Sequence, residues 1–306
     1  MSHPISLFKA LADETRLRLY HILTRHELNV NELTAIMGMG QSRVSRHLKI
    51  LADCGLVAPR RDGLWVFYAV RAGSDEPAAA FAACLDGLLA PHPEYAADLA
   101  RARRAIEDRT RATTRFFNEV AGDWESMAKE ILGGFDLPAA IAARVPACAT
   151  VADLGCGTGD VLAALEPCAG QRIGVDGSQK MLDRARDRFG AASGLSLRIG
   201  ELEHLPLRDA EADTVVMSMV LHHLSDPATG LREAYRVVRP GGAFVLADFD
   251  KHASEALRTR HGDHWLGFTE QELLAWLREA GFDIRASDAV SLDSGLRIRL
   301  VTAHKP

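Results

Sequence analysis

The sequence lacks the features that would place the chain in a membrane or in a disulfide-stabilised fold. No run of 18 apolar residues occurs, and the Ala-rich stretch 78–90 is interrupted by Asp86 and Gly87, so no membrane-spanning helix is expected. The five cysteines are scattered without any Cys-x-x-Cys spacing, which argues against a disulfide framework. No cationic leader followed by a hydrophobic core stands at the N-terminus. Together these absences lead us to expect a cytoplasmic protein.

The sequence does contain enough apolar material for two folded domains, with charge divided unevenly along it. The chain has 306 residues, of which 47% are hydrophobic, and a formal net charge of -5 at pH 7. This length is sufficient for two domains. Residues 1–73 carry ten Lys or Arg and six Asp or Glu, an excess of +4, so the remainder carries -9. A basic excess confined to one region is typical of a nucleic-acid-binding domain.

The most informative stretch is residues 151–159, Val-Ala-Asp-Leu-Gly-Cys-Gly-Thr-Gly. Its apolar start indicates a strand, and the apolar positions Val161, Leu162 and Leu165 indicate the helix that follows. Glycines in such a turn let the backbone pass close beneath a nucleotide ligand. A dinucleotide-binding loop would need a glycine at position 160, where this chain has Asp160, and pyrophosphate would sit poorly beside a carboxylate. The loop therefore predicts a nucleotide cradle of another kind.

Further segments follow the glycine loop in order. Residues 172–176 indicate a second strand that ends in Asp176, 17 residues after Gly159, where a carboxylate can accept hydrogen bonds from both hydroxyls of a ribose. Asp-Gly-Ser-Gln-Lys-Met-Leu stands at 176–182, Gly-Glu-Leu-Glu-His-Leu-Pro-Leu at 200–207, and Arg-Val-Val-Arg-Pro-Gly-Gly at 236–242. Several motifs in one fixed order along the chain rarely arise together by chance.

In this order the segments resemble the motifs of class I S-adenosylmethionine (SAM)-dependent methyltransferases, in particular the ubiquinone-biosynthesis and arsenite-type enzymes. The resemblance implies that SAM, or its demethylated product S-adenosylhomocysteine, is the cofactor. Those families usually have Asp at the position of Glu201. The longer side chain of Glu would shift the contact with the cofactor. The residues implied to hold the cofactor are Asp153, Gly155, Gly157, Gly159, Asp176, Met181, Glu201, Leu202 and Ser218.

From about residue 149 onward, strand-like and helical segments alternate. Later strands are expected at 212–218, 243–248, 282–287 and 296–303, and helices at 227–238 and 269–280, the latter closed by Gly281. This alternation predicts an α/β Rossmann-like fold with a mostly parallel sheet and helices on both faces, and the resemblance implies seven strands. In such folds ligands lie at the carboxyl ends of the strands.

The first 70 residues carry a different pattern. Residues 7–23 predict two amphipathic helices with Asp13 as the N-cap between them, and residues 31–37 predict a short third helix ending at Gly38. Residues 41–54 predict a fourth helix, on which Val44, Leu48 and Leu51 face inward. Its outward positions are polar or basic, namely Gln41, Ser42, Arg43, Ser45, Arg46 and Lys49. This pattern favours a helix-turn-helix whose second helix reads base edges; a helical bundle with a solvated basic face is the alternative.

Residues 57–70 then predict two strands around Asp62-Gly63, a strong signal for a β-hairpin. The hairpin would form a wing that brings Arg60 and Arg61 near DNA phosphates. The region resembles the ArsR/SmtB winged-helix repressors through Ala-Leu-Ala-Asp-Glu-Thr-Arg-Leu at 10–17, Val-Ser-Arg-His-Leu-Lys-Ile-Leu at 44–51 and Gly-Leu-Val at 55–57. The resemblance implies an α+β winged helix that binds double-stranded operator DNA as a homodimer.

A departure from that family bears on metal sensing. Its metal-sensing members carry a Glu-Leu-Cys-Val-Cys-Asp-Leu box, whereas this chain has Glu-Leu-Asn-Val-Asn-Glu-Leu at 27–33, with Asn29 and Asn31 at the thiolate positions. Asn amides are poor ligands for soft metals. The family's other site needs paired His and Asp on the last helix, and residues 77–90 contain no His. We therefore expect no metal and a different input to DNA binding, for which the SAM pocket is the obvious candidate.

Pro91 and Pro93 mark the end of the first domain. Beyond them, apolar residues at three-and-four spacing predict a long helix from about residue 94 toward Gly122. This helix could bridge onto the next domain or form a seam between two protomers, and residues 77–90 are the expected dimer helix. The predicted organisation is a winged-helix domain at 1–92, a linking helical segment at 93–135 and a methyltransferase domain at 136–306.

The catalytic residues are less well defined, because methyl transfer from SAM depends chiefly on positioning the acceptor. His222 and Asp248, near the ends of the fourth and fifth strands, are the candidates, although a His-His-Leu segment is more often packing or capping. The segment after the fourth strand lacks the Pro-Pro-aromatic tetrad of DNA amino-methyltransferases and the Pro-Cys nucleophile of cytosine C5 enzymes. The clustered thiols that arsenic methylation needs are also missing.

Two functions therefore stay open. The first is a DNA-binding transcriptional regulator that responds to SAM or S-adenosylhomocysteine rather than to metal. The alternative is an active methyltransferase for a small-molecule acceptor, with the DNA-binding domain serving autoregulation. A titration of operator DNA with and without the two ligands would separate them.

Overall fold

The computed structural model describes residues 4–70, 84–85, 87–89 and 91–306. The chain divides into two compact units, Met1–Arg109 and Thr110–Pro306. The division falls inside the 28-residue helix α6 (Pro93–Val120), so the predicted linking segment 93–135 belongs partly to each unit. The predicted dimer helix 77–90 lies mostly outside the described residues. Among the described residues, none of the helices combines the length with the hydrophobicity of a membrane-spanning segment.

The N-terminal unit opens with four helices, α1 (Pro4–Leu11), α2 (Glu14–Leu23), α3 (Val30–Met37) and α4 (Gln41–Asp53). Asp13 caps α2 as predicted, because its side chain accepts the backbone N–H of Arg16. α3 begins one residue earlier than predicted, since Asn29 and Glu32 form a capping box. The apolar faces of the four helices meet in one buried cluster that includes Leu19, Leu33 and Leu48. The helix-turn-helix therefore packs on the face that its periodicity predicts.

A small antiparallel sheet completes this unit in the strand order β1 (Leu28–Asn29), β3 (Trp65–Ala69), β2 (Ala58–Asp62). Asp62 pairs with Trp65, so the two-residue turn is Gly63-Leu64, one residue later than predicted. Gly63 has a φ of +58°, and a glycine with positive φ at the first turn position matches a type II′ hairpin. The hairpin itself is present where the sequence predicts the wing.

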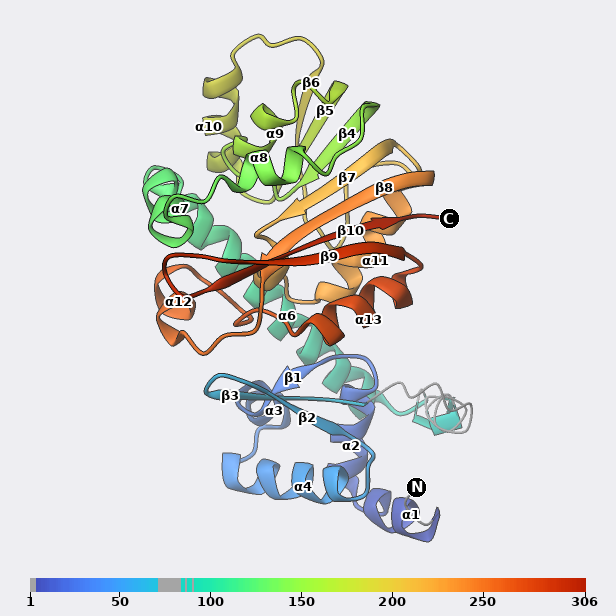
Figure 1. The fold of residues 1–306 in the computed structure, drawn as a ribbon. Coiled ribbons are helices and arrows are strands. Elements are labelled where there is room, and N and C mark those ends of the chain that lie inside the picture. The colour runs from blue at the N-terminus through green and yellow to red at the C-terminus, as the bar shows by residue number, and fades with distance from the viewer. Residues whose placement is uncertain (1–3, 71–83, 86, 90) are drawn as a thin grey trace. The chain divides into compact units, whose positions relative to one another are not determined.

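The C-terminal unit contains the seven-stranded sheet in the order β6-β5-β4-β7-β8-β10-β9 (Figure 1). Its strands are β4 (Cys148–Leu154), β5 (Ala169–Asp176), β6 (Leu195–Ile199), β7 (Ala212–Ser218), β8 (Val238–Phe249), β9 (Asp283–Ser291) and β10 (Arg297–His304). Only β10 runs antiparallel to its neighbours β8 and β9, so the sheet is mostly parallel as predicted. β8 starts five residues before the predicted strand and includes Pro240-Gly241-Gly242, with an irregular register opposite residues 212–214.

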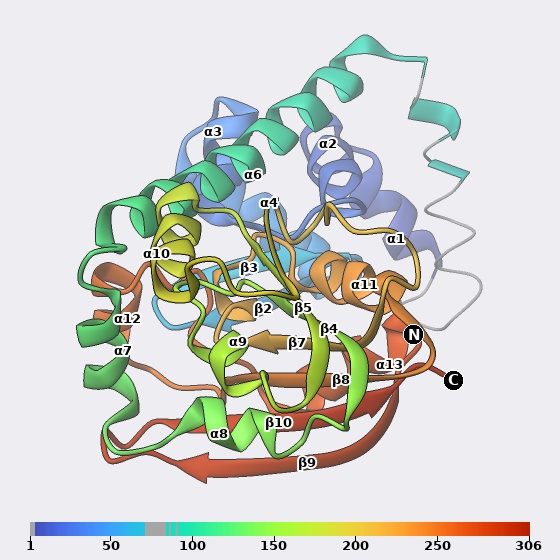
Figure 2. The same ribbon diagram turned by 90° about the horizontal axis from the view of Figure 1, so that it is seen from above.

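Helices cover both faces of this sheet, as the alternating pattern predicts. α8 (Leu137–Ala142) and α9 (Asp160–Ala164) pack in one cluster with Val216 and Val245. Phe244, the neighbour of Val245 in β8, points to the opposite face of the sheet. Its ring stacks on the ring of Phe282, with 4.7 Å between the ring centroids, beside α11 (Pro227–Val237) and α13 (Glu270–Ala280). Figure 2 shows α8 and α11 on opposite sides of the central strands. The remaining helices are α7 (Trp124–Leu132), α10 (Gln179–Phe189), α12 (Glu255–Arg260) and the 3-10 turn η1 (Leu221–His223).

The strand order reverses between β4 and β7, since the chain runs outward from β4 through β5 to β6 and then returns to β7. A reversal of this kind leaves a crevice outside the carboxyl ends of the two central strands. The residues that follow β4 and β7 are the glycine loop and η1, respectively. The topology therefore places both at the crevice where ligands bind in such folds.

Candidate functional site

The glycine loop lines a pocket at the carboxyl ends of β4, β5 and β7. Gly155 has a φ of +79°, and a Cβ atom there would lie 2.4 Å from a methyl group of Val220. Gly159 has a φ of +88°, and its Cβ would lie 2.5 Å from the ring of Phe189. Both positions therefore require glycine, for the backbone conformation and for space. Gly157 borders the pocket, where a Cβ atom would lie 3.8 Å from the indole nitrogen of Trp124.

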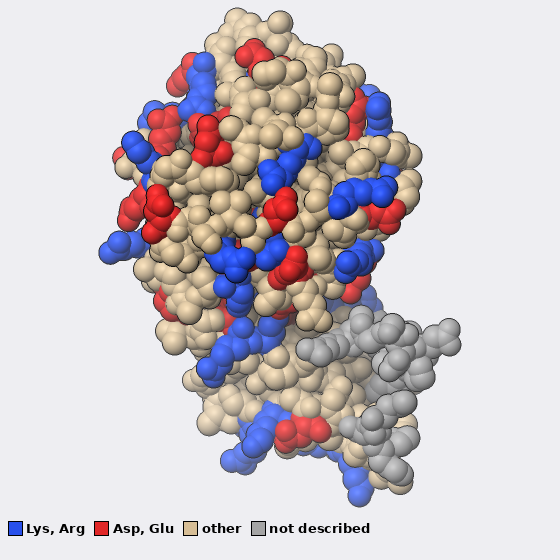
Figure 3. Space-filling view, viewed as in Figure 1, with Lys and Arg blue, Asp and Glu red and all other residues tan. Residues whose placement is uncertain are grey.

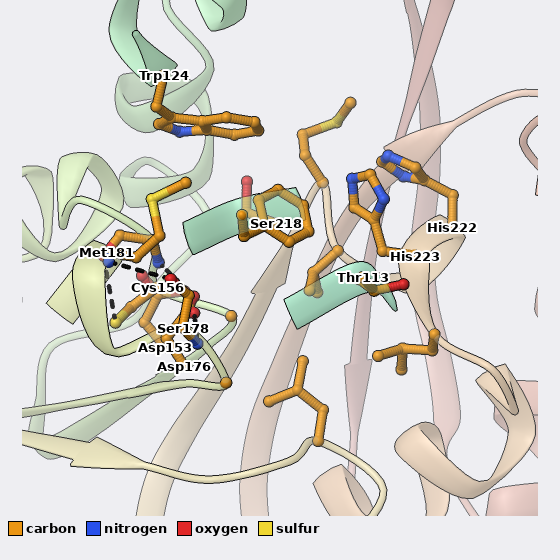
Figure 4. Close-up of a pocket in the computed structure, with 18 of the residues that line it drawn as sticks. Thr113, Trp124, Asp153, Cys156, Asp176, Ser178, Met181, Ser218, His222 and His223 are labelled. Carbon is orange, nitrogen blue, oxygen red and sulfur yellow. Dashed lines mark hydrogen bonds between the residues drawn. The ribbon is translucent and has the colours of Figure 1, made fainter. Parts of the chain in front are cut away.

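The predicted cofactor residues, with the exception of Gly159, lie around this one pocket. Gly159 instead begins α9 and packs against Phe189. Figure 4 shows Asp153, Asp176, Ser178 and Met181 together on one side of the pocket. Met181 is buried on α10, and Ser218 ends β7. The sequence motifs are thus brought together from separate strands, which is the arrangement a nucleoside ligand requires.

Asp176 is held by the backbone at the end of β5. Its two oxygens accept the N–H groups of Gly157 at 2.9 Å and Ser178 at 2.7 Å. Burial raises the pKa of this carboxyl group, and the two backbone hydrogen bonds partly oppose the rise. Each oxygen keeps a second lone pair. The carboxylate is therefore oriented and can still accept hydrogen bonds from ribose hydroxyls.

Asp153 has a different environment. It is only 1% exposed, and neither of its oxygens has a hydrogen-bond partner among the residues that the structure describes. Burial, with added repulsion from Asp176 and Asp160, raises the pKa of Asp153 to about 8. A buried carboxylate without a partner costs free energy unless a donor or a cation reaches it. A ligand carrying positive charge, as SAM does on its ammonium and sulfonium groups, fits that requirement.

The C-terminal part of α6 supplies a wall of the same pocket through Thr110, Thr113, Thr114 and Phe117. Asn118 ties this helix to the cofactor motif, because its side-chain oxygen accepts the hydroxyl of Ser178 at 2.9 Å. These residues were not among the predicted site residues. The helical periodicity of residues 94–122 could have indicated that α6 packs, but not against which element.

His222 and His223 lie together across the pocket from the acidic residues (Figure 4). The Nδ1 atom of His222 lies 2.7 Å from Asp248, whose oxygens also accept the N–H groups of Leu221 and Phe249. Burial lowers the pKa of His222, but attraction to Asp248 and Asp263 outweighs burial, so the net pKa is raised. The structure therefore brings the two predicted catalytic candidates into one buried pair. Asp263, which reaches the same pocket from the segment after α12, was not predicted.

Most of the predicted DNA-reading side chains lie on the exposed face of α4. Gln41, Ser42, Arg43, Arg46 and Lys49 are exposed, and Ser45 is half-buried. In Figure 3 Lys and Arg side chains are visible over the region of α4. Val44, Leu48 and Leu51 are fully buried on the opposite face. An exposed polar face backed by a buried apolar face lets a recognition helix contact DNA without disturbing the core.

The two arginines of the wing differ in their surroundings. Arg60 pairs with Glu27 through two hydrogen bonds of 2.8 and 3.1 Å and lies over the ring of Phe67. Arg61 is exposed. Phosphate contact by Arg60 would require it to exchange Glu27 for a phosphate, whereas Arg61 is already at the surface. Asn29, at a thiolate position of the metal-sensing box, caps α3, and Asn31 is exposed.

Comparisons with known proteins agree with this division of the chain. Residues 13–58 match the bacterial regulatory protein family arsR, and residues 152–246 match a methyltransferase domain family. The chain is 33% identical over 141 residues to a ubiquinone/menaquinone biosynthesis C-methyltransferase of Desulfotalea psychrophila, covering 44% of this chain and 56% of that protein. It is 32% identical over 157 residues to an arsenite methyltransferase of Halobacterium salinarum, covering 48% and 40%.

Another relative is an uncharacterised 37.1 kDa protein of a Streptomyces fradiae transposon, 41% identical over 101 residues, which are 32% of this chain and 29% of that protein. The chain thus spans between 29% and 56% of the length of these three curated relatives. Among solved structures, a chain of the complex between the Haloferax volcanii Trm112 methyltransferase activator and a methyltransferase aligns at a TM-score of 0.55 and 23% identity, covering 62% of this chain and 97% of that one.

A SAM-dependent methyltransferase from Thermotoga maritima aligns at a TM-score of 0.52 and 20% identity, covering 63% of this chain and 100% of that one. At this identity the structural likeness establishes the fold. The fold, the matched families and the cofactor motifs agree. Residues 13–58 thus form a helix-turn-helix region that matches the ArsR family, and residues 152–246 lie in a domain with the Rossmann-like methyltransferase fold.

Proposed function

We propose that this protein is a DNA-binding transcriptional regulator whose DNA affinity responds to SAM or S-adenosylhomocysteine. Gln41, Arg43, Ser45 and Arg46 would contact base edges, while Lys49, Arg60 and Arg61 would contact the phosphate backbone. In the other unit Asp176 would hold the ribose, and the glycine loop would hold the rest of the nucleoside. As in other winged-helix repressors, a homodimer would read paired half-sites.

The observation that carries this proposal is the position of α6 in the structure of each unit. In the N-terminal unit, Asp98 of α6 is fully buried and accepts two hydrogen bonds from Arg18. Further along the same helix, Arg109 pairs with Glu32, the residue that closes the capping box of α3. In the C-terminal unit, Thr113 and Phe117 of α6 line the ligand pocket.

A ligand that contacts Thr113 and Phe117 therefore acts on a helix that also anchors the helix-turn-helix. Binding at one site changes affinity at the other only if the ligand prefers one arrangement of this shared element, and the coupling is then reciprocal. SAM and S-adenosylhomocysteine differ by a methyl group and a positive charge. Because Asp153 is buried and has no hydrogen-bond partner among the residues that the structure covers, the two ligands should differ in affinity, and through α6 in their effect on DNA binding.

The test is a DNA titration of the full chain, using a duplex selected from random sequences for tight binding. We expect the midpoint to shift at least fivefold when one of the two ligands is saturating, because allosteric coupling is typically about 1–3 kcal/mol. Operator binding should in turn change the ligand affinity by the same factor. A midpoint that stays unchanged with both ligands, although both bind, would refute the sensor function.

A second function is supported by the part of the pocket that the cofactor residues do not account for. Trp124, Ile131, Leu132, Leu137 and Pro138 line it with apolar surface, which suits a small apolar or aromatic methyl acceptor. In this function His222, oriented by Asp248, is the candidate base. Turnover of methyl-labelled SAM in the presence of a panel of phenols, amines and thiols tests it, with the His222→Gln variant for comparison.

A further inference from the structure

Three buried side chains at the edge of the pocket form a cluster of metal-ligating type. His222, His223 and Asp263 each offer one ligand atom, and these atoms all lie within 4.8 Å of one another. The three residues are 2%, 5% and 3% exposed, yet all three line the pocket. His222 and His223 come from η1, which follows β7, and Asp263 comes from the loop after α12. The cluster is therefore built by tertiary structure and faces the ligand space.

The hydrogen bonds of the two imidazoles determine which nitrogens remain available. The Nδ1 atom of His223 lies 3.2 Å from the carbonyl oxygen of Gly262. Because a carbonyl oxygen can only accept, this Nδ1 carries the proton. The Nδ1 atom of His222 lies 2.7 Å from the Asp248 carboxylate, to which it donates in the same way. Both rings therefore keep Nε2 free of these bonds, and metal-ligating histidines are usually held by just such a bond through their other nitrogen.

The carboxylate of Asp263 is placed to complete the set. One oxygen lies 3.7 Å from Nε2 of His222, and the other is buried without a hydrogen-bond partner among the described residues. This second oxygen is therefore available to a cation that enters the cluster.

Charge points in the same direction. Asp248 and Asp263 are buried carboxylates at 0% and 3% exposure, and both act on His222. A divalent cation bound between them would balance the charge of the two carboxylates. It would also give the unpaired oxygen of Asp263 a partner.

We propose that His222 Nε2, His223 Nε2 and the Asp263 carboxylate form a binding site for a divalent transition-metal ion, with Asp248 and the Gly262 carbonyl as its supporting hydrogen-bond acceptors. Two imidazoles and one carboxylate suit Zn²⁺, Co²⁺ or Fe²⁺ better than Mg²⁺ or Ca²⁺, which prefer oxygen ligands. Bonds of about 2.0–2.2 Å require the three ligand atoms to draw closer by side-chain rotation. Three protein ligands leave a coordination position toward the pocket for a ligand oxygen or sulfur.

This site is separate from the metal box of the ArsR family, which has Asn29 and Asn31 at its thiolate positions here. It does not depend on whether DNA binding responds to SAM. A metal ion at this site would exclude the role of His222 as a base, because Nε2 cannot accept a proton while it holds the metal ion. A metal-loaded protein would therefore activate an acceptor by coordination rather than through His222.

The experiment uses the full chain treated with a chelator and then titrated with Co²⁺, whose visible absorption reports the ligand geometry, and with Zn²⁺ in competition. We expect one Co²⁺ per chain, with absorption bands of a four- or five-coordinate nitrogen and oxygen site. X-ray absorption of the Zn²⁺ form should show two imidazoles. Because this readout uses the unmodified chain, it does not depend on whether a variant folds.

Variants then assign the ligands. Asp263→Asn and His223→Gln should each weaken Co²⁺ binding at least tenfold, and Asp248→Asn should weaken it about 10- to 100-fold through the loss of the supporting hydrogen bond. The matched control is His304→Gln, a histidine at the end of β10 outside the pocket, which should bind as the parent does. Absence of Co²⁺ binding in the parent chain, or equal binding in the Asp263→Asn and His304→Gln variants, would overturn the site. SAM binding, measured in parallel, reports independently on the cofactor pocket.

Discussion

Two buried aspartates, one in each unit, show how differently the two halves of the molecule use charge. Asp98 is 0% exposed, accepts two hydrogen bonds from Arg18 and pairs with Arg101. Asp153 is 1% exposed and has no hydrogen-bond partner among the described residues. The first carboxylate is satisfied by the fold. The second is available to a ligand, because a buried polar group without a partner is costly and each such group in a native structure calls for an explanation.

The same contrast extends to the rest of each unit. In the N-terminal unit the candidate functional side chains lie on the exposed face of α4, and the core behind them is apolar. In the C-terminal unit the candidate residues are buried around a pocket, and several of their polar atoms have no hydrogen-bond partner within the described part of the chain, as at Asp153 and Asp263. A surface that binds a large polyanion can be fully formed in advance. A pocket for a small charged ligand reserves part of its hydrogen bonding for that ligand.

The largest expected effect is the loss of the satisfied carboxylate. Asp98→Asn should destabilise the N-terminal unit by about 3 kcal/mol, at the lower end of the cost of breaking a buried pair, because the Arg18 side chain remains 21% exposed. Chemical denaturation of the full chain, followed by circular dichroism, measures this as an earlier first transition. Glu94→Gln, on an exposed site of the same helix, is the control. If both variants show the first transition at the same denaturant concentration as the parent, Asp98 does not anchor α6.

The next effect concerns the cofactor. Asp176→Ala should weaken binding of both SAM and S-adenosylhomocysteine about 10- to 100-fold, because hydrogen bonds to a charged group contribute about 1.5–3 kcal/mol and the variant also frees the N–H groups of Gly157 and Ser178. Isothermal titration calorimetry measures the loss. Asp183→Ala, an exposed acid on α10, should leave both affinities unchanged. Undiminished binding by the Asp176 variant would mean that the pocket holds the nucleoside elsewhere.

On the exposed side of the comparison, Arg43→Ala should cost about 1–3 kcal/mol of discrimination between the selected duplex and a scrambled one, if its guanidinium reads a guanine. Arg61→Ala is the matched variant, since both side chains are exposed. It should weaken binding to both duplexes alike and lower the salt dependence by about one counterion. Fluorescence anisotropy at several salt concentrations separates the two behaviours. If the Arg43→Ala variant keeps full discrimination between the two duplexes, Arg43 of α4 does not read the base sequence.

A further effect is a pH dependence that arises from Asp153. Its pKa is raised to about 8, so below pH 8 the carboxyl group of the ligand-free protein is mostly protonated and must lose its proton to pair with a cationic ligand. SAM affinity should therefore rise with pH up to about 8, by at most tenfold per unit. Calorimetry in buffers of different ionisation enthalpy detects the released proton. Asp153→Asn should bind SAM weakly with no such dependence, and a pH slope that persists in this variant would assign it to another group.

The same carboxyl group affects the stability of the ligand-free protein with the opposite sign. A folded-state pKa of about 8, above the ordinary value of 3.8, means that the native state retains the proton more tightly than the unfolded state does. Its stabilising contribution is complete below about pH 4 and is lost as the pH rises toward 8. Asp153→Asn should flatten this part of the stability profile, whereas Asp98→Asn should lower stability throughout. The two variants therefore test the comparison directly.

Much of the architecture could be predicted from local patterns. Asp13 and Thr269 cap their helices through side-chain hydrogen bonds, and Gly281 ends α13 in a left-handed conformation. Such signals act within a few residues, so the sequence displays them. The predicted position of the wing turn is wrong by one residue, because Asp62 stays in the strand and Gly63 adopts the positive φ at the first turn position. Gly63 belongs to the turn both in the prediction and in the structure, and only the pairing of the two strands shows which neighbour completes the turn.

Taken alone, the sequence determined the two classes of fold, the glycine loop, the acid at the end of β5 and the exposed polar face of α4, because each depends on periodicity or on spacing along the chain. Only the tertiary structure decided that α6 lines the ligand pocket, that His222 pairs with Asp248, and that His223 and Asp263 join it. These contacts connect residues distant in sequence. They arise from how strands and helices pack, and packing leaves no local pattern from which Asp263 could have been distinguished from any other loop aspartate.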